Sequence, residues 1–302
     1  MLKNQRHRLV VAALVMASLA AAQTQQVASP GVRSQLLVST EWLGQHLSDP
    51  HLVIIHAGHN EKDYSTAHIP GARFLAWDKF VDVQSPLRTE LLPIEELKKN
   101  FEEIGISDDS RVVIYAPEWD PQAARVFLTL DYLGLGNHAA LLDGGIKQWF
   151  NEKRPYTSAV PAVTHGHLSV HEHPEIIIKI KQIKNIVAGQ SGPSQAVLID
   201  SRPDKRYRDG HLPGAAPMYW QKMQASEENP VLRPPQELRA MFREAGVTPG
   251  KQVISYCEVG QQASYTYFVA RYLGLDAAMY DGSMHEWSMM QEQPVVKGNA
   301  PR

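Results

Sequence analysis

The sequence predicts an α/β protein with two domains of one fold, each a parallel sheet with helices on both faces. Two observations support this fold class. Motifs of the first half return in the same order in the second half, about 140 residues later, as in a duplicated domain. Within each half, short apolar runs alternate with segments of helical periodicity, which is typical of parallel strands joined by covering helices.

The repeated motifs run along most of both halves. The chain reads His-Ile-Pro-Gly-Ala at residues 68–72 and His-Leu-Pro-Gly-Ala at residues 211–215. The further matches pair residues 93–115 with 234–256, 132–135 with 272–275, and the Asp-Gly…Trp segments 143–149 with 281–287. Because the order is kept over this long spacing, each half is expected to be one domain rather than a unit of a short-period solenoid.

Local patterns predict the elements of each half in turn. In the first half we expect strand 52–56, a helix with one apolar face at 94–104, strand 112–115 and helix 124–133. In the second half the corresponding elements are strand 196–200, helix 238–245, strand 253–256 and helix 263–273. A glycine that suits a helix C-cap follows each helix, at positions 105, 134, 246 and 274.

Composition excludes several classes of function. Lys and Arg number 30 and Asp and Glu number 32, so the net charge is −2 and there is no general electrostatic footprint for nucleic acid or an anionic membrane. Cys257 is the one cysteine of the chain. An intramolecular disulfide and a multi-cysteine zinc or iron–sulfur site are therefore excluded.

Residues 1–22 have the three parts of a secretory signal peptide. Lys3, Arg6 and Arg8 make the start positive, residues 9–19 are apolar, and three alanines precede an expected cut after Ala22. The apolar run is shorter than the roughly 20 residues of a membrane span, which favours cleavage over an uncleaved anchor. We therefore expect a periplasmic or secreted protein with no membrane contact after cleavage. A free thiol is unusual in such a compartment.

The mature chain is expected to divide into a domain without a cysteine at 35–155, a linker at 156–174 and a domain with Cys257 at 175–298. Four linker histidines alternate in a way that could bind zinc or copper, although a solvated linker is favoured and no metal site is assigned: His165, His167, His171 and His173. His68 and His211 occur in both halves, so a packing role is favoured for them, with a place for His68 in the cleft between the domains as the alternative.

Cys257 lies where a ligand site is expected in a parallel sheet. It follows the strand 253–256 and precedes the helix 263–273, with Glu258, Val259, Gly260, Gln261 and Gln262 between them. Free backbone N–H groups of such a loop, together with the helix dipole, stabilise a thiolate. The alternative is a small buried hydrophobic residue. The first half has Ala116 at the matching place, so it cannot perform the same chemistry and is expected to shape the cleft of the other half.

This arrangement resembles the rhodanese (sulfurtransferase) family in its exported, tandem-domain bacterial form, with an empty first half. The resemblance implies that Cys257 takes a sulfane sulfur from thiosulfate or a similar small donor as a persulfide and passes it to a thiophilic acceptor, cyanide or a thiol, with no metal or cofactor. Two alternatives stay open. One is 3-mercaptopyruvate as the donor, and the other is a sulfur carrier that keeps the persulfide for a periplasmic thiol protein.

The resemblance also implies a site for the anionic donor. Arg206 is the best candidate for binding its sulfonate or carboxylate, and Arg202 is the second. The backbone of residues 258–262 forms the cradle for the sulfur. The alternative for both arginines is an ion pair with a nearby carboxylate: Asp200, Asp204 or Asp209.

The loop departs from the family in two positions. Glu258 places a carboxylate beside the thiol, and Gln262 stands where a bacterial relative usually has an arginine. Both changes are expected to weaken attraction for an anionic donor, and the carboxylate raises the thiol pKa. The related cysteine phosphatases need an arginine six positions after the cysteine. Position 263 is alanine, so phosphate transfer is not expected.

Overall fold

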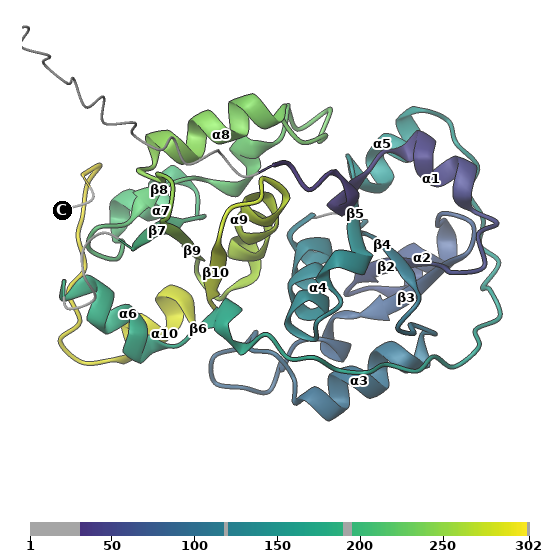
Figure 1. Cartoon of the computed structure of the whole chain (residues 1–302), viewed down its shortest axis with the longest axis horizontal. Coiled ribbons are helices and arrows are strands. Elements are labelled where there is room, and N and C mark those ends of the chain that lie inside the picture. The colour runs from purple at the N-terminus through teal and green to yellow at the C-terminus, as the bar shows by residue number, and fades with distance from the viewer. Residues whose placement is uncertain (1–30, 118–119, 190–194, 301–302) are drawn as a thin grey trace, which may run out of the picture.

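The computed structural model describes residues 31–117, 120–189 and 195–300, and within them the chain forms two α/β domains (Figure 1). The expected signal peptide, residues 1–22, lies outside the described residues. No helix in the described part is long and apolar enough to cross a membrane.

The first domain has one five-stranded sheet, in the order β1-β5-β4-β2-β3, and all its pairings are parallel. Its strands are β1 Leu37–Val38, β2 Leu52–Gly58, β3 Ala72–Ala76, β4 Arg111–Tyr115 and β5 Ala139–Leu142. Its helices are α1 Thr40–His46, α2 Glu61–Thr66, α3 Ile94–Glu103, α4 Asp120–Tyr132 and α5 Gly145–Asn151, with short 3-10 turns η1 Ser34–Leu36, η2 Trp77–Lys79 and η3 Gly136–His138.

The second domain repeats this design with the sheet order β6-β10-β9-β7-β8, again parallel throughout. Its strands are β6 Ile177–Ile178, β7 Ala196–Asp200, β8 Ala216–Pro217, β9 Gln252–Tyr256 and β10 Ala277–Tyr280. Its helices are α6 Ile180–Val187, α7 Asp204–Asp209, α8 Pro235–Glu244, α9 Gln261–Tyr272 and α10 Ser283–Met289, with 3-10 turns η4 Pro174–Ile176 and η5 Trp220–Met223.

Helices cover both faces of each sheet, as the sequence predicts. Along β2, Val53 and Ile55 belong to the core shared with α3 and α4, whereas Ile54 packs on the opposite face with α1, α2 and α5. This alternation follows from the strand geometry, in which successive side chains point to opposite faces. Because both faces are covered, the central strands are apolar at nearly every position. The second sheet is covered in the same way by α8 and α9 on one face and α6 and α10 on the other.

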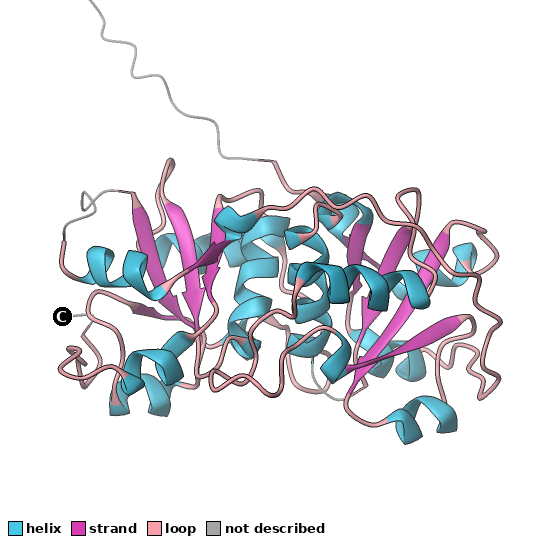
Figure 2. Ribbon diagram, turned by 90° about the horizontal axis from the view of Figure 1, so that it is seen from below, coloured by secondary structure: helices cyan, strands magenta, loops and turns pink. Residues whose placement is uncertain are grey.

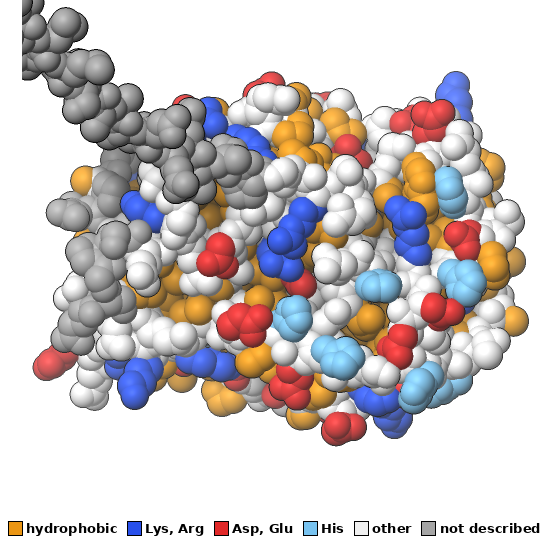
Figure 3. Space-filling view, viewed as in Figure 1, with side chains coloured by type: hydrophobic (Ala, Val, Ile, Leu, Met, Phe, Trp, Pro, Cys, Tyr) orange, Lys and Arg blue, Asp and Glu red, His pale blue; other side chains and the backbone are white. Residues whose placement is uncertain are grey.

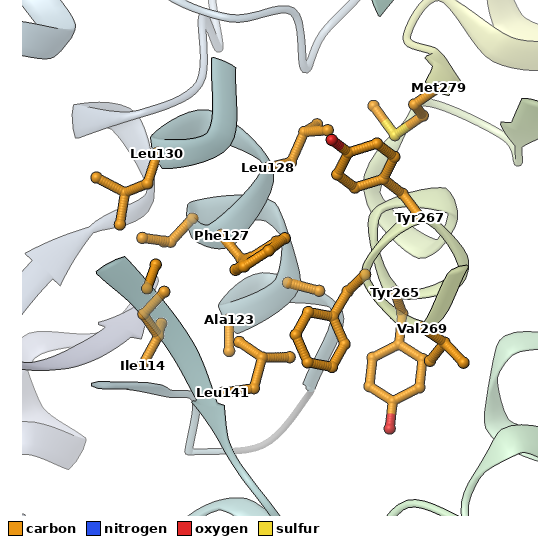
Figure 4. Packing of buried hydrophobic residues seen from close by; sticks show 14 of the residues in the cluster. Ile114, Ala123, Phe127, Leu128, Leu130, Leu141, Tyr265, Tyr267, Val269 and Met279 are labelled. Atoms are coloured by element: carbon orange, nitrogen blue, oxygen red, sulfur yellow. The ribbon is translucent and has the colours of Figure 1, made fainter. Parts of the chain in front are cut away.

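The two domains share one continuous apolar core. Helices α4 and α9 lie side by side between the two sheets (Figure 2) and belong to a single cluster of buried residues. Phe127 and Phe268 meet edge to face with ring centroids 5.0 Å apart. Figure 4 shows Phe127 and Leu128 of α4 and Tyr267 of α9 pointing into the space between the two helices. The interface therefore resembles a domain interior, and it fixes the positions of the two sheets relative to each other.

Residues 156–174 run along the first domain instead of standing free of it. Leu168 is 1% exposed, and the N–H groups of His167, Leu168 and Ser169 donate to side-chain oxygens of the first domain at 2.7–3.0 Å. The side chains of His165, His167 and His171 remain exposed. Several histidine side chains lie on the face of the molecule that Figure 3 shows. Among the described residues, no group of three or more His, Cys, Asp or Glu is arranged to hold a metal ion.

The packing role expected of the two repeated histidines is confirmed. His68 is fully buried, stacks on Tyr64 with ring centroids 3.9 Å apart, and bonds through Nδ1 to the Tyr64 carbonyl at 2.6 Å. His211 is equally buried and makes the matching bond to the Tyr207 carbonyl at 2.8 Å. The Nε2 of His68 contacts the Ala159 carbonyl at 3.2 Å, so this ring ties down residues that follow the first domain.

Candidate active site

Cys257 lies at the carboxyl edge of the second sheet, directly after β9. Strand β9 is the middle strand of the order β6-β10-β9-β7-β8, so the cysteine is flanked by the ends of β10 and β7. Asp281 follows β10 and Ser201 follows β7. Ligands of open parallel sheets bind at this edge.

Backbone N–H groups converge on the Cys257 thiol. Those of Val259, Gly260, Gln262 and Ala263 bond to its sulfur and lower the thiol pKa. Burial acts in the opposite direction and is the larger effect, so the pKa of Cys257 is raised above its ordinary value. The side chain is only 1% exposed. The site is thus a buried anion cradle that holds a largely protonated thiol at neutral pH.

The cradle matches the predicted loop in part. Three of its donors, Val259, Gly260 and Gln262, belong to the expected set 258–262. Ala263 is a fourth donor that the sequence reasoning did not include, because it places the first helical residues outside the loop. Gln261 is the first residue of α9, and the carbonyl of Glu258 accepts the His285 N–H at 2.9 Å. Their roles in substrate binding stay predictions.

Ser283 anchors the backbone of the cysteine. Its Oγ accepts the Cys257 N–H at 3.1 Å and donates to the Tyr280 carbonyl at 2.9 Å. The serine is fully buried and has a φ of 54°, which is left-handed backbone that few residues other than glycine adopt. The first domain has Gly145 at the matching place, with a φ of 55°. The cysteine-bearing domain therefore keeps a strained serine where glycine would fit without strain. The change from Asp-Gly-Gly to Asp-Gly-Ser between the two halves is the sequence signal for it.

Arg202 is buried beside the site in a network of carboxylates and carbonyls. Its Nη2 donates to Asp200 at 2.7 Å and to the Gly210 carbonyl at 2.6 Å, and its Nη1 lies 3.2 Å from the Glu258 carboxylate. The pairing with Asp200 is the ion pair that the sequence analysis gave as the alternative for this arginine. Arg202 also holds the Glu258 carboxylate beside a positive charge, which partly offsets the rise in the thiol pKa that a neighbouring carboxylate is expected to cause.

Arg206 has a different environment. It lies on α7 with an exposed side chain. A hydrogen bond from Lys205 lowers the pKa of Asp209, and the charges of Arg206 and Arg208 add to this effect. Among the described residues, no hydrogen bond or ion pair joins the Arg206 side chain to the loop 257–260, and its donor-binding role stays a prediction.

The matching edge of the first domain is hollow. Ala116 stands where the second domain has Cys257, and a cavity of about 220 Å³ opens there toward the other domain. It is lined from the first domain by Ala116, Pro117, Gly144, Gly145, Ile146 and Lys147, and from the second by Tyr219, Trp220, Gln221, Gln224, Glu227 and Pro230. Alanine carries no thiol, so this edge lacks the candidate nucleophile that Cys257 gives the second domain.

The first domain also reaches the edge that bears the cysteine. Arg125 of α4 forms a buried ion pair with Asp281, and the Pro86 carbonyl meets His285 Nε2 at 3.0 Å. Sequence reasoning did not find these residues, because each pair joins segments that are far apart in the chain.

Comparisons with known proteins agree with this architecture. The model of the rhodanese-like domain matches twice, at residues 39–152 and 183–290. The chain is 31% identical over 284 residues to a protein named sulfur carrier protein TtuD of Thermus thermophilus, with 87% of this chain and 97% of the relative covered. It is 28% identical to a thiosulfate sulfurtransferase of Azotobacter vinelandii, with 86% of this chain and 96% of that relative covered.

Solved structures show the same fold. The anaerobic ergothioneine biosynthesis enzyme of Chlorobium limicola superimposes with a TM-score of 0.76 at 22% identity, over 87% of this chain and 70% of that one. A structure of YnjE gives 0.77 at 24% identity over 88% of this chain. The two domain matches together span well over half of the chain, and the Thermus relative is aligned over almost its full length. The chain therefore belongs to the rhodanese family and carries two rhodanese-like domains in tandem.

Proposed function

We propose that the chain is a sulfurtransferase that carries a sulfane sulfur on Cys257 as a persulfide, from thiosulfate or a similar donor to cyanide or a thiol. The observation that carries this proposal is the convergence of four backbone N–H groups on the only cysteine. Family membership and the named relatives support sulfur transfer in general. Thiosulfate as the donor rests on the names of relatives such as the Azotobacter enzyme.

The proposed reaction has two displacement steps. The Cys257 thiolate attacks the outer sulfur of thiosulfate, an Sγ–S bond forms, and sulfite leaves with the electron pair of the broken S–S bond. Cyanide then attacks the outer sulfur of the persulfide, the Sγ–S bond breaks toward Sγ, and thiocyanate leaves while the thiolate returns. A thiolate acceptor removes the sulfur in the same way and becomes a persulfide. This is covalent, ping-pong catalysis that needs no external oxidant or reductant.

The cradle suits each anionic form of the cysteine. Fixed N–H donors in a site that excludes water stabilise negative charge without reorganising, and both thiolate and persulfide place that charge near the same loop. Because burial raises the pKa of Cys257, the thiolate fraction is small at neutral pH. We therefore expect the rate of sulfur loading to rise with pH through and above the ordinary range of a thiol pKa.

The two arginines take different parts in the proposal. The exposed guanidinium of Arg206 is free to meet an incoming sulfonate, and a planar fork suits that group. The guanidinium of Arg202 is already bonded to Asp200, Glu258 and the Gly210 carbonyl, so its part is to hold the first residue of the loop, Glu258, in place.

A sulfur carrier is the second candidate function, and the burial of Cys257 favours it. A thiol with 1% exposure is poorly accessible to small acceptors, so a persulfide formed there would be long-lived until a partner opened the site. The relative at 31% identity is itself named a sulfur carrier protein.

The test is a donor panel read by intact mass. Wild type and Cys257→Ser are incubated with thiosulfate or 3-mercaptopyruvate, and the mass gain of one sulfur atom and the production of thiocyanate from cyanide are measured. A sulfurtransferase gains the sulfur and turns over many times, whereas a carrier gains it and turns over once. The donor with the higher initial rate decides between thiosulfate and 3-mercaptopyruvate. A wild type that gains no sulfur from either donor, or a Cys257→Ser variant as active as wild type, would refute the assignment.

We further propose that the protein acts in the periplasm or outside the cell after cleavage at Ala22, where a thiol protein can serve as acceptor. The support is the pattern of residues 1–22. N-terminal sequencing of protein from cell fractions tests it. A cytoplasmic protein that keeps residues 1–22 would overturn this proposal without touching the chemistry of Cys257.

A further inference from the structure

The domain without a cysteine contributes a buried arginine to the edge that bears Cys257. Arg125 of α4 is fully buried. Its Nη1 donates to Asp281 Oδ1 at 2.7 Å and its Nη2 to Asp281 Oδ2 at 2.9 Å, so the pair is bidentate. The same Nη2 also donates to the carbonyl of Thr89. A guanidinium held by three acceptors has one orientation and holds Asp281 in one place.

Asp281 in turn forms the wall behind Gly260 of the thiol loop. Gly260 has a φ of 84°, and a Cβ built on it would lie 2.4 Å from Asp281 Oδ1 and 2.7 Å from the Asp281 carbonyl oxygen. The same Cβ would lie 3.5 Å from Nη1 of Arg125. The ion pair therefore sits directly against the backbone of a residue whose N–H bonds to the sulfur of Cys257.

We propose that Arg125 is a positioning residue for the cradle of Cys257: through Asp281 it holds Gly260 in the conformation that points its N–H at the sulfur. The proposal rests on the function proposed above and assigns a task to the domain that has no cysteine of its own. Arg125 acts through Asp281 and the loop, and no contact of its own with the sulfur is needed.

Comparison of the two halves separates this task from simple interdomain packing. Asp143, the counterpart of Asp281, accepts the backbone N–H of Leu232 at 2.8 Å. In α9 the place that matches Arg125 is taken by Tyr265, seven residues before Tyr272 as Arg125 is before Tyr132. The buried bidentate arginine is thus found on the side that serves the cysteine. A buried ion pair contributes little net free energy of folding, because the cost of desolvating the charges offsets their attraction. This also favours a positioning role for Arg125 over a role in stability alone.

The same interface supplies a matched control. Asp131, also on α4, accepts from Tyr267 Oη at 2.6 Å and pairs with Nε of Arg271 at 2.9 Å. Like Asp281, it is a buried carboxylate that joins the two domains, at 2% exposure against 3%. Asp131→Asn therefore perturbs the interface without touching the wall behind Gly260.

The experiment measures the ionisation of Cys257 itself. The chain has one cysteine, so [13C]cysteine labelling gives a single Cβ resonance, and its titration yields the thiol pKa of the folded protein. Wild type, Arg125→Lys, Arg125→Met and Asp131→Asn are compared. Lysine keeps the charge of the arginine and loses the bidentate fork, so it separates geometry from charge balance.

We expect Arg125→Lys to raise the thiol pKa by about half a unit to one unit, and Arg125→Met by at least one unit, through weakened N–H bonding to the thiolate. The rate of sulfur loading at fixed pH should fall about 3- to 10-fold for the lysine variant, in step with the thiolate fraction. Asp131→Asn should lower the melting temperature and leave the thiol pKa within about 0.2 units of wild type.

Two results would overturn the proposal. One is a folded Arg125→Lys protein with the thiol pKa of wild type, and the other is an equal shift in Asp131→Asn, which would make the effect one of general packing. If Arg125→Met does not fold, Arg125→Lys decides the matter. A wild type that transfers no sulfur refutes the proposed function, yet the thiol pKa comparison still shows whether Arg125 positions the cradle.

Discussion

Substitution of Ser283 separates the strain of the cysteine site from its hydrogen bonding. The buried hydroxyl of Ser283 accepts the Cys257 N–H and donates to the Tyr280 carbonyl, while its backbone is left-handed with a φ of 54°. Ser283→Ala keeps the strain and loses both bonds. Ser283→Gly loses the same bonds and relieves the strain, because glycine adopts positive φ without cost from a Cβ.

The magnitudes follow from these two terms. A buried N–H left without a partner costs about 1–3 kcal/mol, so Ser283→Ala should lower the free energy of unfolding by that amount. Relief of left-handed strain returns about 1 kcal/mol to Ser283→Gly. The expected order of stability is wild type, then glycine, then alanine. Urea unfolding followed by tryptophan fluorescence measures these free energies, and an alanine variant as stable as the glycine variant would refute the strain reasoning.

The rate of sulfur loading should depend on the presence of the Ser283 hydroxyl and not on the stability of the variant. Both variants release the backbone of Cys257, so both should load sulfur from thiosulfate about 10-fold more slowly, a change of about 1.4 kcal/mol in the barrier. Gly145→Ala is the matched control, since Gly145 has the same left-handed backbone in the domain without a cysteine. It should lose about 1 kcal/mol of stability and keep the wild-type loading rate. A Ser283→Gly variant that loads at the wild-type rate would show that the hydroxyl is not needed.

Four further predictions concern ionisable side chains. Glu258→Gln should speed loading by thiosulfate 2- to 5-fold, because an exposed carboxylate near the anion is removed, with a stability change below about 0.5 kcal/mol; slower loading would contradict this. Arg206→Ala should raise the KM for thiosulfate, whereas Arg208→Ala, at an exposed position of the same helix, should leave the KM unchanged; equal KM values for the two variants would remove Arg206 from the site. Arg202→Ala should instead lower the free energy of unfolding by about 3–5 kcal/mol, because the buried carboxylate of Asp200 loses its partner. Burial lowers the pKa of His56 from 6.5 to about 4, so the unfolded chain binds a proton at this residue at a higher pH than the folded chain does. The contribution of His56 to the free energy of unfolding should therefore be complete above pH 6.5 and fall by about 2 kcal/mol between pH 6.5 and pH 5. His56→Gln should lose this part of the pH dependence, and a variant whose free energy of unfolding changes with pH as steeply as that of wild type would contradict the assignment.

Much of the fold is determined by local patterns in the sequence. The mainly apolar runs at 196–200 and 253–256 became β7 and the end of β9, because a strand buried on both faces is apolar at nearly every position. The helix expected at 263–273 is α9, with a start two residues earlier at Gln261. The strand–cysteine–loop–helix order placed Cys257 at the carboxyl edge of a parallel sheet, as the topology requires.

Local sequence patterns did not predict the shortest strands or the packing of residues 156–174. The edge strands β1 and β6 are two residues long, so they show no periodicity, and they exist because β5 and β10 offer free edges. The burial of Leu168 likewise depends on the surface of the first domain, which no local pattern describes.

The sequence by itself determined that the chain contains two copies of one fold and that only the second copy has a cysteine. The tertiary structure decided how the two copies cooperate. Arg125 and Asp281 meet because α4 packs against α9, and Ser283 reaches Cys257 because the chain turns left-handed after β10. Contacts of this kind depend on the packing of whole elements, and their energies are set by burial that a local pattern of residues does not contain.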